Sequence, residues 1–413
     1  MAIEKRTAQE LVVKAGLELM ESGLIARTWG NVSARISDNV FVITPSGIPY
    51  EKLTPDDIVE VTIDELEYDE NGLKPSSEKG VHAAAYKHHP EVDFVIHTHQ
   101  IAASAVSVEE KDIAVPDAYQ AVLGPVIPNA EYGMPSTGKL KDAVDAAIAA
   151  NPASKAILMR HHGTVCLGSD YDDAFKVVNT LEDFCKERVA AAVKAACPPS
   201  DCCSCSTMED LACAYTATQV PAENRDIALV DLGSSLREGD TFTLFMDGGE
   251  RYECSVETGK AVPGAPIAPR VSELHSEIYK NTDDIIIRNY QTPEAIALSK
   301  KGETQKAYLD DFCQIAGTTV ANINWDPTSY RTDAVEAGKA ASGRNAILVK
   351  GQGALCTGAN PYDTEAVKLV LEKEAISAMY GQIIGGANTL GTIDRILQRL
   401  VYKMKYSKQA DKK

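Results

Sequence analysis

The segment DFVIHTHQ, residues 93–100, ends an apolar run with two histidines that are separated by one residue. Side chains at positions i and i+2 of a β-strand project to the same side of the sheet. The imidazoles of His97 and His99 can therefore share one metal ion, or they can be two unrelated groups that are solvated or packed. Taken alone, this pattern favours unrelated groups, so the decision depends on further ligands elsewhere in the chain.

A third imidazole is available in RHHG, residues 160–163, which follows the apolar run AILM. Gly163 allows a sharp bend that would direct His162 into a cleft at the strand end. Glu78, in KPSSEKGVH, precedes an expected helix and could act as a fourth ligand or a base. Three imidazoles with an exchangeable carboxylate or water are typical of a catalytic zinc site, so the combination favours a metal. His82, one helical turn beyond Glu78, is expected to support that site or to lie in the core.

Three short loops combine Gly or Pro with Ser, Thr or Asn: RTWGNVSAR at 27–35, TPSGIP at 44–49 and PSSE at 75–78. Such loops present the backbone amides and hydroxyls that phosphate oxygens need as donors. Ser76 and Ser77 could also open a helix, whose first amides favour an anion. Each loop could equally be an ordinary turn, and none matches a P-loop or a dinucleotide-binding fingerprint.

The elements that must position these residues occur twice. SKAILMRHHGTVCLGSDYDDAFKVV resembles RNAILVKGQGALCTGANPYDTEAVKLV, and VHAAAYKHHPEVDFVIHTHQ resembles LHSEIYKNTDDIIIRNYQ, in the same order and about 190 residues apart. Two matches in register favour a tandem duplication. Strands alternate with helices in each copy, which indicates a layered α/β or α+β structure. The predicted division is a first copy at 1–196, a Cys-rich linker at 197–206, a second copy at 207–405 and a basic tail at 406–413.

Composition narrows the class of protein. The chain has 413 residues, which exceeds one ordinary domain and predicts two cores. A formal charge of −18 disfavours nucleic acid and anionic membrane surfaces as partners. No run approaches the length of a membrane span, and the N-terminal segment has no signal-peptide core. The ten cysteines are not spaced like a secreted disulfide scaffold, so a reduced, cytoplasmic setting is expected.

The predicted linker, CPPSDCCSC, contains a Cys-x-x-Cys pair, Cys202 and Cys205. Cys197, Cys203 and Cys213 lie nearby, so a zinc or iron–sulfur site is possible. The spacing fits no standard ligand set, which favours a flexible reduced linker instead.

In order along the chain, GNVSAR, TPSGIPYEKL, PSSE followed by a histidine, HTH and HHG resemble the class II aldolase/adducin family, and within it the zinc-dependent L-fuculose-phosphate aldolases. The resemblance covers about residues 7–190, with a fainter echo in the second half. It implies a three-layer α/β/α sandwich with a mostly antiparallel central sheet, duplicated in tandem.

The resemblance also implies roles for single residues. His97, His99 and His162 would hold zinc together with Glu78, which would serve as the base once substrate displaces it. Tyr119, in VPDAYQAVLG, matches a family tyrosine that acts as an acid, often across a subunit interface. The implied phosphate pocket comprises Thr28, Gly30, Asn31, Ser46, Gly47, Ser76 and Ser77.

The implied activity is that of a metal-dependent aldolase. It would cleave a phosphorylated ketose to dihydroxyacetone phosphate and an aldehyde through a zinc-stabilised enediolate. One Zn²⁺ per chain, or another divalent metal, would lie in the first copy. A sugar-phosphate epimerase, dehydratase or decarboxylase of the same superfamily is the alternative within the enzymes. A non-enzymatic, adducin-like assembly protein is the alternative from a different class.

The second copy lacks the candidate ligands. Aligning the repeats by sequence gives the pairs Arg288 with His97, Asn289 with Thr98, Tyr290 with His99, Gln352 with His162, Val271 with Glu78, Phe312 with Tyr119 and Asp247 with Ser46. The sequence therefore predicts a non-catalytic second copy. Its expected role is assembly, as part of an interface in a homo-oligomer.

Overall fold

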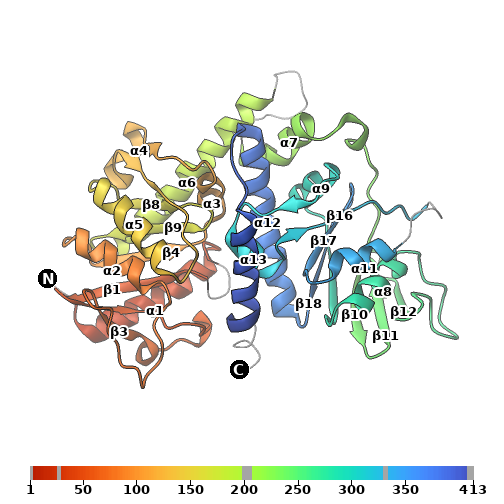
Figure 1. Cartoon of the computed structure of the whole chain (residues 1–413), viewed down its shortest axis with the longest axis horizontal. Helices are drawn as coiled ribbons and strands as arrows, with labels where there is room; N and C mark the ends of the chain where they lie inside the picture. Colours follow the sequence, from red (N-terminus) through yellow and green to blue (C-terminus); the bar gives the residue numbers. More distant parts are fainter. Residues whose placement is uncertain (1–2, 26–28, 198–206, 329–333, 407–413) are drawn as a thin grey trace. The chain divides into compact units, whose positions relative to one another are not determined.

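The computed structural model describes residues 3–25, 29–197, 207–328 and 334–406 (Figure 1). The chain divides into two compact units, Met1–Val189 and Ala190–Ser407. The division falls inside a long helix. The predicted linker 197–206 lies outside the described residues except for Cys197, so its other cysteines do too.

The first unit is built on a seven-stranded sheet of order β3-β2-β1-β4-β9-β8-β7. All of its neighbouring strands are antiparallel except β7 and β8. In that order the strands are Val59–Thr62, Val40–Ile43, Asn31–Ser37, Phe94–Thr98, Gly163–Gly168, Ala156–Met159 and Asn129–Ala130. A separate two-stranded pair joins β5 (Ile113–Ala114) to β6 (Val126–Ile127).

Helices cover both faces of this sheet, as the three-layer prediction required (Figure 1). They are α1 (Lys5–Glu21), α2 (Lys79–His88), α3 (Ile101–Ser107), α4 (Asp117–Leu123), α5 (Gly138–Ala150) and α6 (Tyr171–Ala196). Apolar residues of α2 and α5 pack with Val95, Val165 and Leu167 in one core cluster. Helix α1 packs against β1 and β2, and α3 against β8 and β9. Strand β4 is buried along its whole length, which explains the apolar run FVI at its start.

The second unit repeats this plan, with a sheet of order β12-β11-β10-β13-β18-β17-β16. The strands are, in that order, Arg251–Ser255, Thr241–Phe245, Ser234–Glu238, Ile286–Tyr290, Gly353–Gly358, Ala346–Val349 and Asn322–Ile323, with a further pair β14 (Gln305–Lys306) and β15 (Thr319–Val320). The helices are α7 (Leu211–Gln219), α8 (Ser272–Asn281), α9 (Pro293–Lys300), α10 (Asp310–Ile315), α11 (Val335–Ala341), α12 (Pro361–Ile384) and α13 (Thr392–Val401). Identical strand order in two sheets of one chain supports the predicted tandem duplication.

The strand registers correct the sequence alignment of the two copies by one residue. His97 pairs with Val165 in β9, which lies two residues after the first glycine of GTVCLG. The corresponding position of GALCTG in β18 is Leu355, and its partner is Asn289. Asn289 therefore stands opposite His97, and Gln291 opposite His99. The expected pairs Arg288 with His97, Asn289 with Thr98 and Tyr290 with His99 were wrong, because matching Gln100 to Gln291 imposed one deletion too many.

No helix in the described parts of the chain is long and apolar enough to cross a membrane.

Candidate active site

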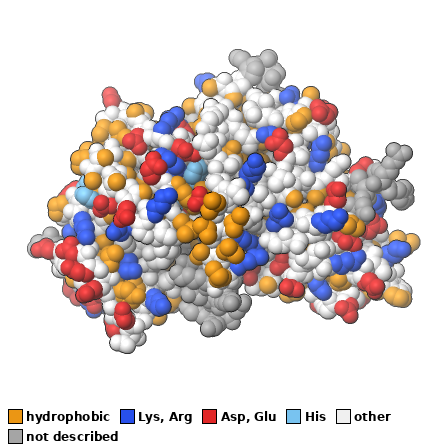
Figure 2. All heavy atoms as spheres, viewed as in Figure 1, with side chains coloured by type: hydrophobic (Ala, Val, Ile, Leu, Met, Phe, Trp, Pro, Cys, Tyr) orange, Lys and Arg blue, Asp and Glu red, His pale blue; other side chains and the backbone are white. Residues whose placement is uncertain are grey.

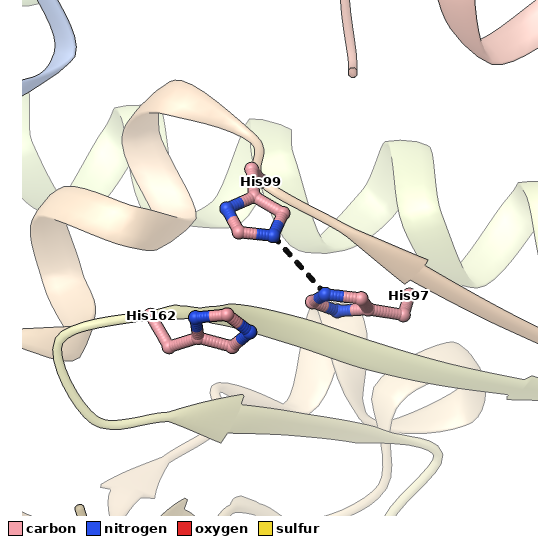
Figure 3. Close-up of side chains that lie close together, drawn as sticks. All are labelled: His97, His99 and His162. Atoms are coloured by element: carbon pink, nitrogen blue, oxygen red, sulfur yellow. Dashed lines mark hydrogen bonds between the residues drawn. The ribbon is translucent and has the colours of Figure 1, made fainter. Parts of the chain in front are cut away.

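Three histidines converge at one end of the first sheet (Figure 3). His97 lies in β4, His99 follows that strand, and His162 lies in the turn between β8 and β9. The Nε2 atoms of His97 and His99 are 3.1 Å apart. One ring nitrogen from each of the three residues lies within 4.8 Å of the others, so the group could hold a metal ion. The structure therefore brings together the three imidazoles that the sequence placed in separate motifs.

Backbone contacts aim the histidine rings. The Nδ1 atom of His97 lies 2.8 Å from the carbonyl oxygen of Thr164, and because a carbonyl can only accept, Nδ1 carries the proton. The Nε2 atom is thereby left as the ligand atom that faces the site. Gly163 fits closely here, because a Cβ atom at this position would press on the Thr98 carbonyl and lie 3.1 Å from the His97 ring.

Glu78 lies between two of the histidines, at the start of α2. Its Oε2 atom is 3.1 Å from Nε2 of His97, and its Oε1 atom is 3.2 Å from Nε2 of His162. Asn31 donates to Oε2 from Nδ2 at 3.2 Å. Burial alone would raise the pKa of Glu78, but the charges of His97 and His162 outweigh burial and hold it well below its ordinary value. The carboxylate form of Glu78 is therefore favoured.

This donor set suits zinc. Zinc–nitrogen bonds of about 2.0–2.1 Å let one ion join imidazole nitrogens that are roughly 3–4 Å apart. The nitrogens of His97 and His99 meet that spacing, and the site supplies three imidazoles with one carboxylate at their edge.

Two of the predicted phosphate loops lie side by side. Pro45 and Pro75 form an antiparallel bridge. On either side of it, Ser46 donates its amide to Lys74, and Ser76 donates its amide to Thr44 at 3.0 Å. Five of the seven predicted phosphate residues lie here or close by: Ser46, Gly47, Ser76, Ser77 and Asn31. The side of this region formed by Ser46, Gly47 and Ser77 is exposed, so a ligand could reach it.

The third loop joins the same end of the sheet. Val32 donates its amide to the Thr44 hydroxyl at 3.3 Å, which ties the start of β1 to the loop after β2. Gly30 has a φ angle of +91°, and a Cβ atom there would lie 2.6 Å from the carbonyl oxygen of His97. Glycine is thus required for β1 to begin so close to the histidines. Thr28 lies outside the described residues.

Tyr119 has a different neighbourhood. In the part of the chain that the structure describes, its ring packs edge-on against Phe184 at 5.5 Å, and its hydroxyl bonds to Glu187. Both partners belong to α6. The hydrogen bond with Glu187 raises the pKa of Tyr119. These contacts do not join Tyr119 to the histidine group of its own unit.

The corresponding place in the second unit holds three amides. Asn289, Gln291 and Gln352 stand where His97, His99 and His162 stand in the first. Nδ2 of Asn289 donates to Oε1 of Gln291, and Nε2 of Gln291 donates to the Gln352 carbonyl. The Gln352 side chain bonds to the backbone of Ala228 and Val230. Neutral amides that are bonded to one another and to backbone replace the imidazole ligands.

Part of this chain is similar to known proteins. The family model described as the class II aldolase and adducin N-terminal domain matches residues 10–189. A 5-methylthioribulose-1-phosphate/5-deoxyribulose-1-phosphate aldolase of Escherichia coli O45:K1 is 40% identical over 169 residues, which cover 40% of this chain and 75% of that protein. The chain belongs to the class II aldolase/adducin family.

Two further proteins are similar to part of this chain. The L-fuculose phosphate aldolase of Escherichia coli K12 is 35% identical over 181 residues, or 44% of this chain and 81% of that protein. The solved L-fuculose-1-phosphate aldolase of Thermus thermophilus is 25% identical, with a TM-score of 0.40 over 47% of this chain and 98% of that one.

Sequence reasoning missed one feature of this candidate site. Ser136, which has a φ angle of +65°, donates its hydroxyl to Ser77 at 2.7 Å. Nothing near Ser136 in the sequence links it to Ser77. His82 is buried and contacts Asn31, in agreement with the expectation that it supports the site or lies in the core.

Proposed function

We propose that this chain is a metal-dependent aldolase that cleaves a phosphorylated ketose to dihydroxyacetone phosphate and an aldehyde. The observation that carries the proposal is the Glu78 carboxylate, held 3.1 and 3.2 Å from two of three converging imidazoles. A base poised beside an electrophilic site is what proton shuttling during C–C cleavage requires. Membership of a family whose relatives are named as aldolases supports the same activity.

The residues of the site have separate roles in this proposal. His97, His99 and His162 would hold one zinc per chain, with Glu78 as a ligand at rest. When bound, zinc supplies a Lewis acid that stabilises negative charge developing on oxygen. Glu78 takes up and returns the proton at its carboxylate. Tyr119 would serve as the acid toward the departing aldehyde, from a neighbouring subunit, since it does not reach the histidines of its own unit.

The loops beside the metal ligands would bind the substrate phosphate. The chain carries a strong net negative charge, so an anionic substrate needs a local set of donors. The hydroxyl groups of Ser46, Ser76 and Ser77 would provide such donors without a cationic side chain, because the amides of Ser46 and Ser76 already donate to backbone carbonyls. The names of the relatives point to ketose 1-phosphates that end in a methyl or methylthio group, such as 5-deoxyribulose 1-phosphate.

The test is cleavage of 5-methylthioribulose, 5-deoxyribulose and L-fuculose 1-phosphates, with release of dihydroxyacetone phosphate followed by coupled NADH oxidation. At least one is expected to be cleaved, and activity is expected to disappear with a chelator and return with zinc. L-Ribulose 5-phosphate is assayed in parallel for epimerisation. Epimerisation without cleavage of any 1-phosphate would replace the aldolase assignment with the epimerase alternative.

We further propose that the chain is a homo-oligomer in which the second unit contributes an interface. Helix α13 supports this, because it exposes an apolar face to solvent (Figure 2). That face comprises Ile393, Ile396, Leu397, Leu400 and, in the π-helical segment Tyr402–Tyr406 that follows, Met404, which are between 40% and 74% exposed. A continuous apolar face of this kind on a soluble unit marks an interaction site.

The opposite face of α13 is polar and fixed in place. Arg399 donates from Nη1 to the carbonyls of Gln314 and Ile315, and from Nη2 to Asn345 at 2.6 Å. Arg395 donates to the carbonyl of Thr318 at 3.0 Å. The helix therefore cannot rotate to bury its apolar face without breaking these bonds. A second copy of the chain is the proposed occupant, because residues 1–189 carry 30 Asp and Glu against 17 Lys and Arg, which complements the lysine-rich end of the chain after α13.

Replacing Ile393 and Leu400 by glutamate is expected to lower the particle mass measured by light scattering, because two charges would have to be buried in the interface. The matched control is Ile267→Glu, at a 93% exposed position outside α13, which is expected to leave the mass unchanged. A monomeric wild-type chain, or a double variant with wild-type mass, would remove α13 from the assembly.

The proposed setting is the reducing cytoplasm. Cys166, Cys185, Cys254, Cys313 and Cys356 are buried free thiols, as expected for a chain that does not rely on disulfides.

A further inference from the structure

A hydrogen-bonded chain of buried side chains lies behind the Glu78 carboxylate. Tyr86 and His82 both contact the Ser33 hydroxyl, at 2.7 and 2.6 Å. The other ring nitrogen of His82, Nε2, contacts Oδ1 of Asn31, and Nδ2 of Asn31 donates to Glu78. Ser33 and His82 are fully buried, and Tyr86 is almost so. None of these groups has a role in the mechanism described above except Glu78 and the phosphate-loop residue Asn31.

The Glu78 carboxylate, at one end of this series of side chains, sets the direction of every hydrogen bond in the series. A carboxylate only accepts, so Asn31 must present its NH₂ group to Glu78 and its oxygen to His82. Nε2 of His82 must then carry the proton, which leaves Nδ1 to accept from the Ser33 hydroxyl. Ser33 in turn accepts from Tyr86. Each donor therefore points toward the active site, and the neutral imidazole of His82 is the link that orients Asn31.

The second unit contains the same buried triad without the site. Ser235 contacts Nδ1 of His275 and the hydroxyl of Tyr279, both at 2.7 Å. Nε2 of His275 ends on the backbone carbonyl of Leu232 instead of on a side chain. The strand register places Gly233 at the position of Asn31. Val271 corresponds to Glu78, because each lies four residues before the triad histidine of its unit.

The surroundings of the two triads also match. Arg35 lies over the Tyr86 ring, and Arg237 over the Tyr279 ring. Each arginine donates to the carbonyl of the tyrosine that it covers. His82 and His275 are both completely buried. The triad is thus a structural element of the fold, and the first unit alone extends it through Asn31 to a catalytic carboxylate.

We propose that His82 is a positioning residue that acts through Asn31 to hold the Glu78 carboxylate toward His97 and His162. Glu78 reaches these histidines only while the Asn31 amide keeps its NH₂ group toward the carboxylate. Without His82, Asn31 can turn its oxygen toward Glu78, and two acceptors would then face each other. The proposal rests on the proposed aldolase function only for its kinetic readout, because the geometry and metal affinity can be measured without substrate.

The experiment compares His82→Leu with His275→Leu in the full-length chain. Leucine fills a similar volume, and each variant loses the same hydrogen bond to its serine hydroxyl. Both are expected to lower the thermal unfolding midpoint by similar amounts. His82→Leu alone is expected to lower kcat roughly 10- to 100-fold, the usual effect of removing a partner of an active-site ligand, with a smaller change in KM. Equal losses of activity in the two variants would reduce His82 to a purely structural role.

Two further measurements separate positioning from stability. His82→Gln keeps an N–H donor for Asn31 and is expected to recover much of the lost kcat. In a double-mutant cycle with Asn31→Ala, His82→Leu is expected to cause little additional loss, because it acts through Asn31. If the loss of kcat in the double variant equals the product of the two separate losses, His82 does not act through Asn31 and the proposal is overturned.

Zinc affinity tests the proposal independently of the reaction. Competition with a chromophoric chelator is expected to show roughly tenfold weaker zinc binding in His82→Leu and unchanged binding in His275→Leu. A crystal structure of His82→Leu should show Glu78 displaced from His97 and His162. If the wild type cleaves no ketose phosphate, the proposed function fails, while these two results still decide the role of His82. Unchanged zinc affinity with Glu78 in place would overturn the proposal.

Discussion

Replacing Glu78 by glutamine is expected to lower kcat for ketose phosphate cleavage by roughly 10²- to 10⁴-fold, the usual contribution of a positioned general base. Glutamine keeps the shape of the side chain but cannot take up a proton. The reaction is expected to lose its proton shuttle while KM changes less, because the loops at Ser46 and Ser76 are untouched. Steady-state kinetics with the best 1-phosphate substrate measures both constants.

The control for this variant is Glu91→Gln. Glu91 also contacts an imidazole, since its Oε1 atom lies 2.9 Å from Nδ1 of His89, but neither residue belongs to the candidate metal site. It is expected to keep wild-type kcat. Unfolding midpoints and zinc content of both variants establish that the comparison concerns chemistry rather than folding. Near-wild-type turnover in Glu78→Gln would remove Glu78 as the base.

Replacing His97 by alanine is expected to reduce bound zinc from about one equivalent per chain to nearly none, and activity with it. His97 is the central member of the group, because its Nε2 atom contacts both His99 and Glu78. Its loss removes one of the three imidazoles and also one of the two histidine contacts that hold Glu78 at the site. Elemental analysis of the purified proteins gives the stoichiometry directly.

The second unit provides the matched control. Asn289→Ala changes the position that corresponds to His97 and is expected to leave the zinc content unchanged, because amides bonded to one another are poor zinc ligands. Two equivalents in the wild type, with one surviving His97→Ala, would show that a metal binds elsewhere. If that second equivalent depended on Cys202 and Cys205, the prediction of a metal-free linker would be the one at fault.

The amino-acid sequence by itself determined the local parts of the candidate site. His97 and His99 share a side because strand geometry alternates every two residues. Gly163 marked the turn that presents His162, and the repeated motifs revealed two copies of one fold. These features depend on residue spacing and on recurring motifs, both of which can be seen in the sequence without a structure.

The sequence alone also suggested a wrong correspondence between the two copies, because identical residues were matched without knowledge of the strand register. A shared glutamine moved the alignment of β13 by one residue and hid the replacement of His97 and His99 by Asn289 and Gln291. Hydrogen-bonded ladders fix register, and a shift of one residue moves every side chain to the other face. Only the paired strands could therefore show that three amides occupy the second copy.

Tertiary structure alone decided the long-range contacts. Glu78 meets His97 and His162 because the start of α2, the end of β4 and the β8–β9 turn lie together at one edge of the sheet. In α13 the sequence pattern is amphipathic, which normally predicts a buried apolar face. The structure instead buries Arg395 and Arg399, because carbonyls at the end of α10 and in the loop after it, among others, satisfy their guanidinium groups. Which face of a helix is buried depends on the partners that the fold brings to it, and those lie far away in the chain.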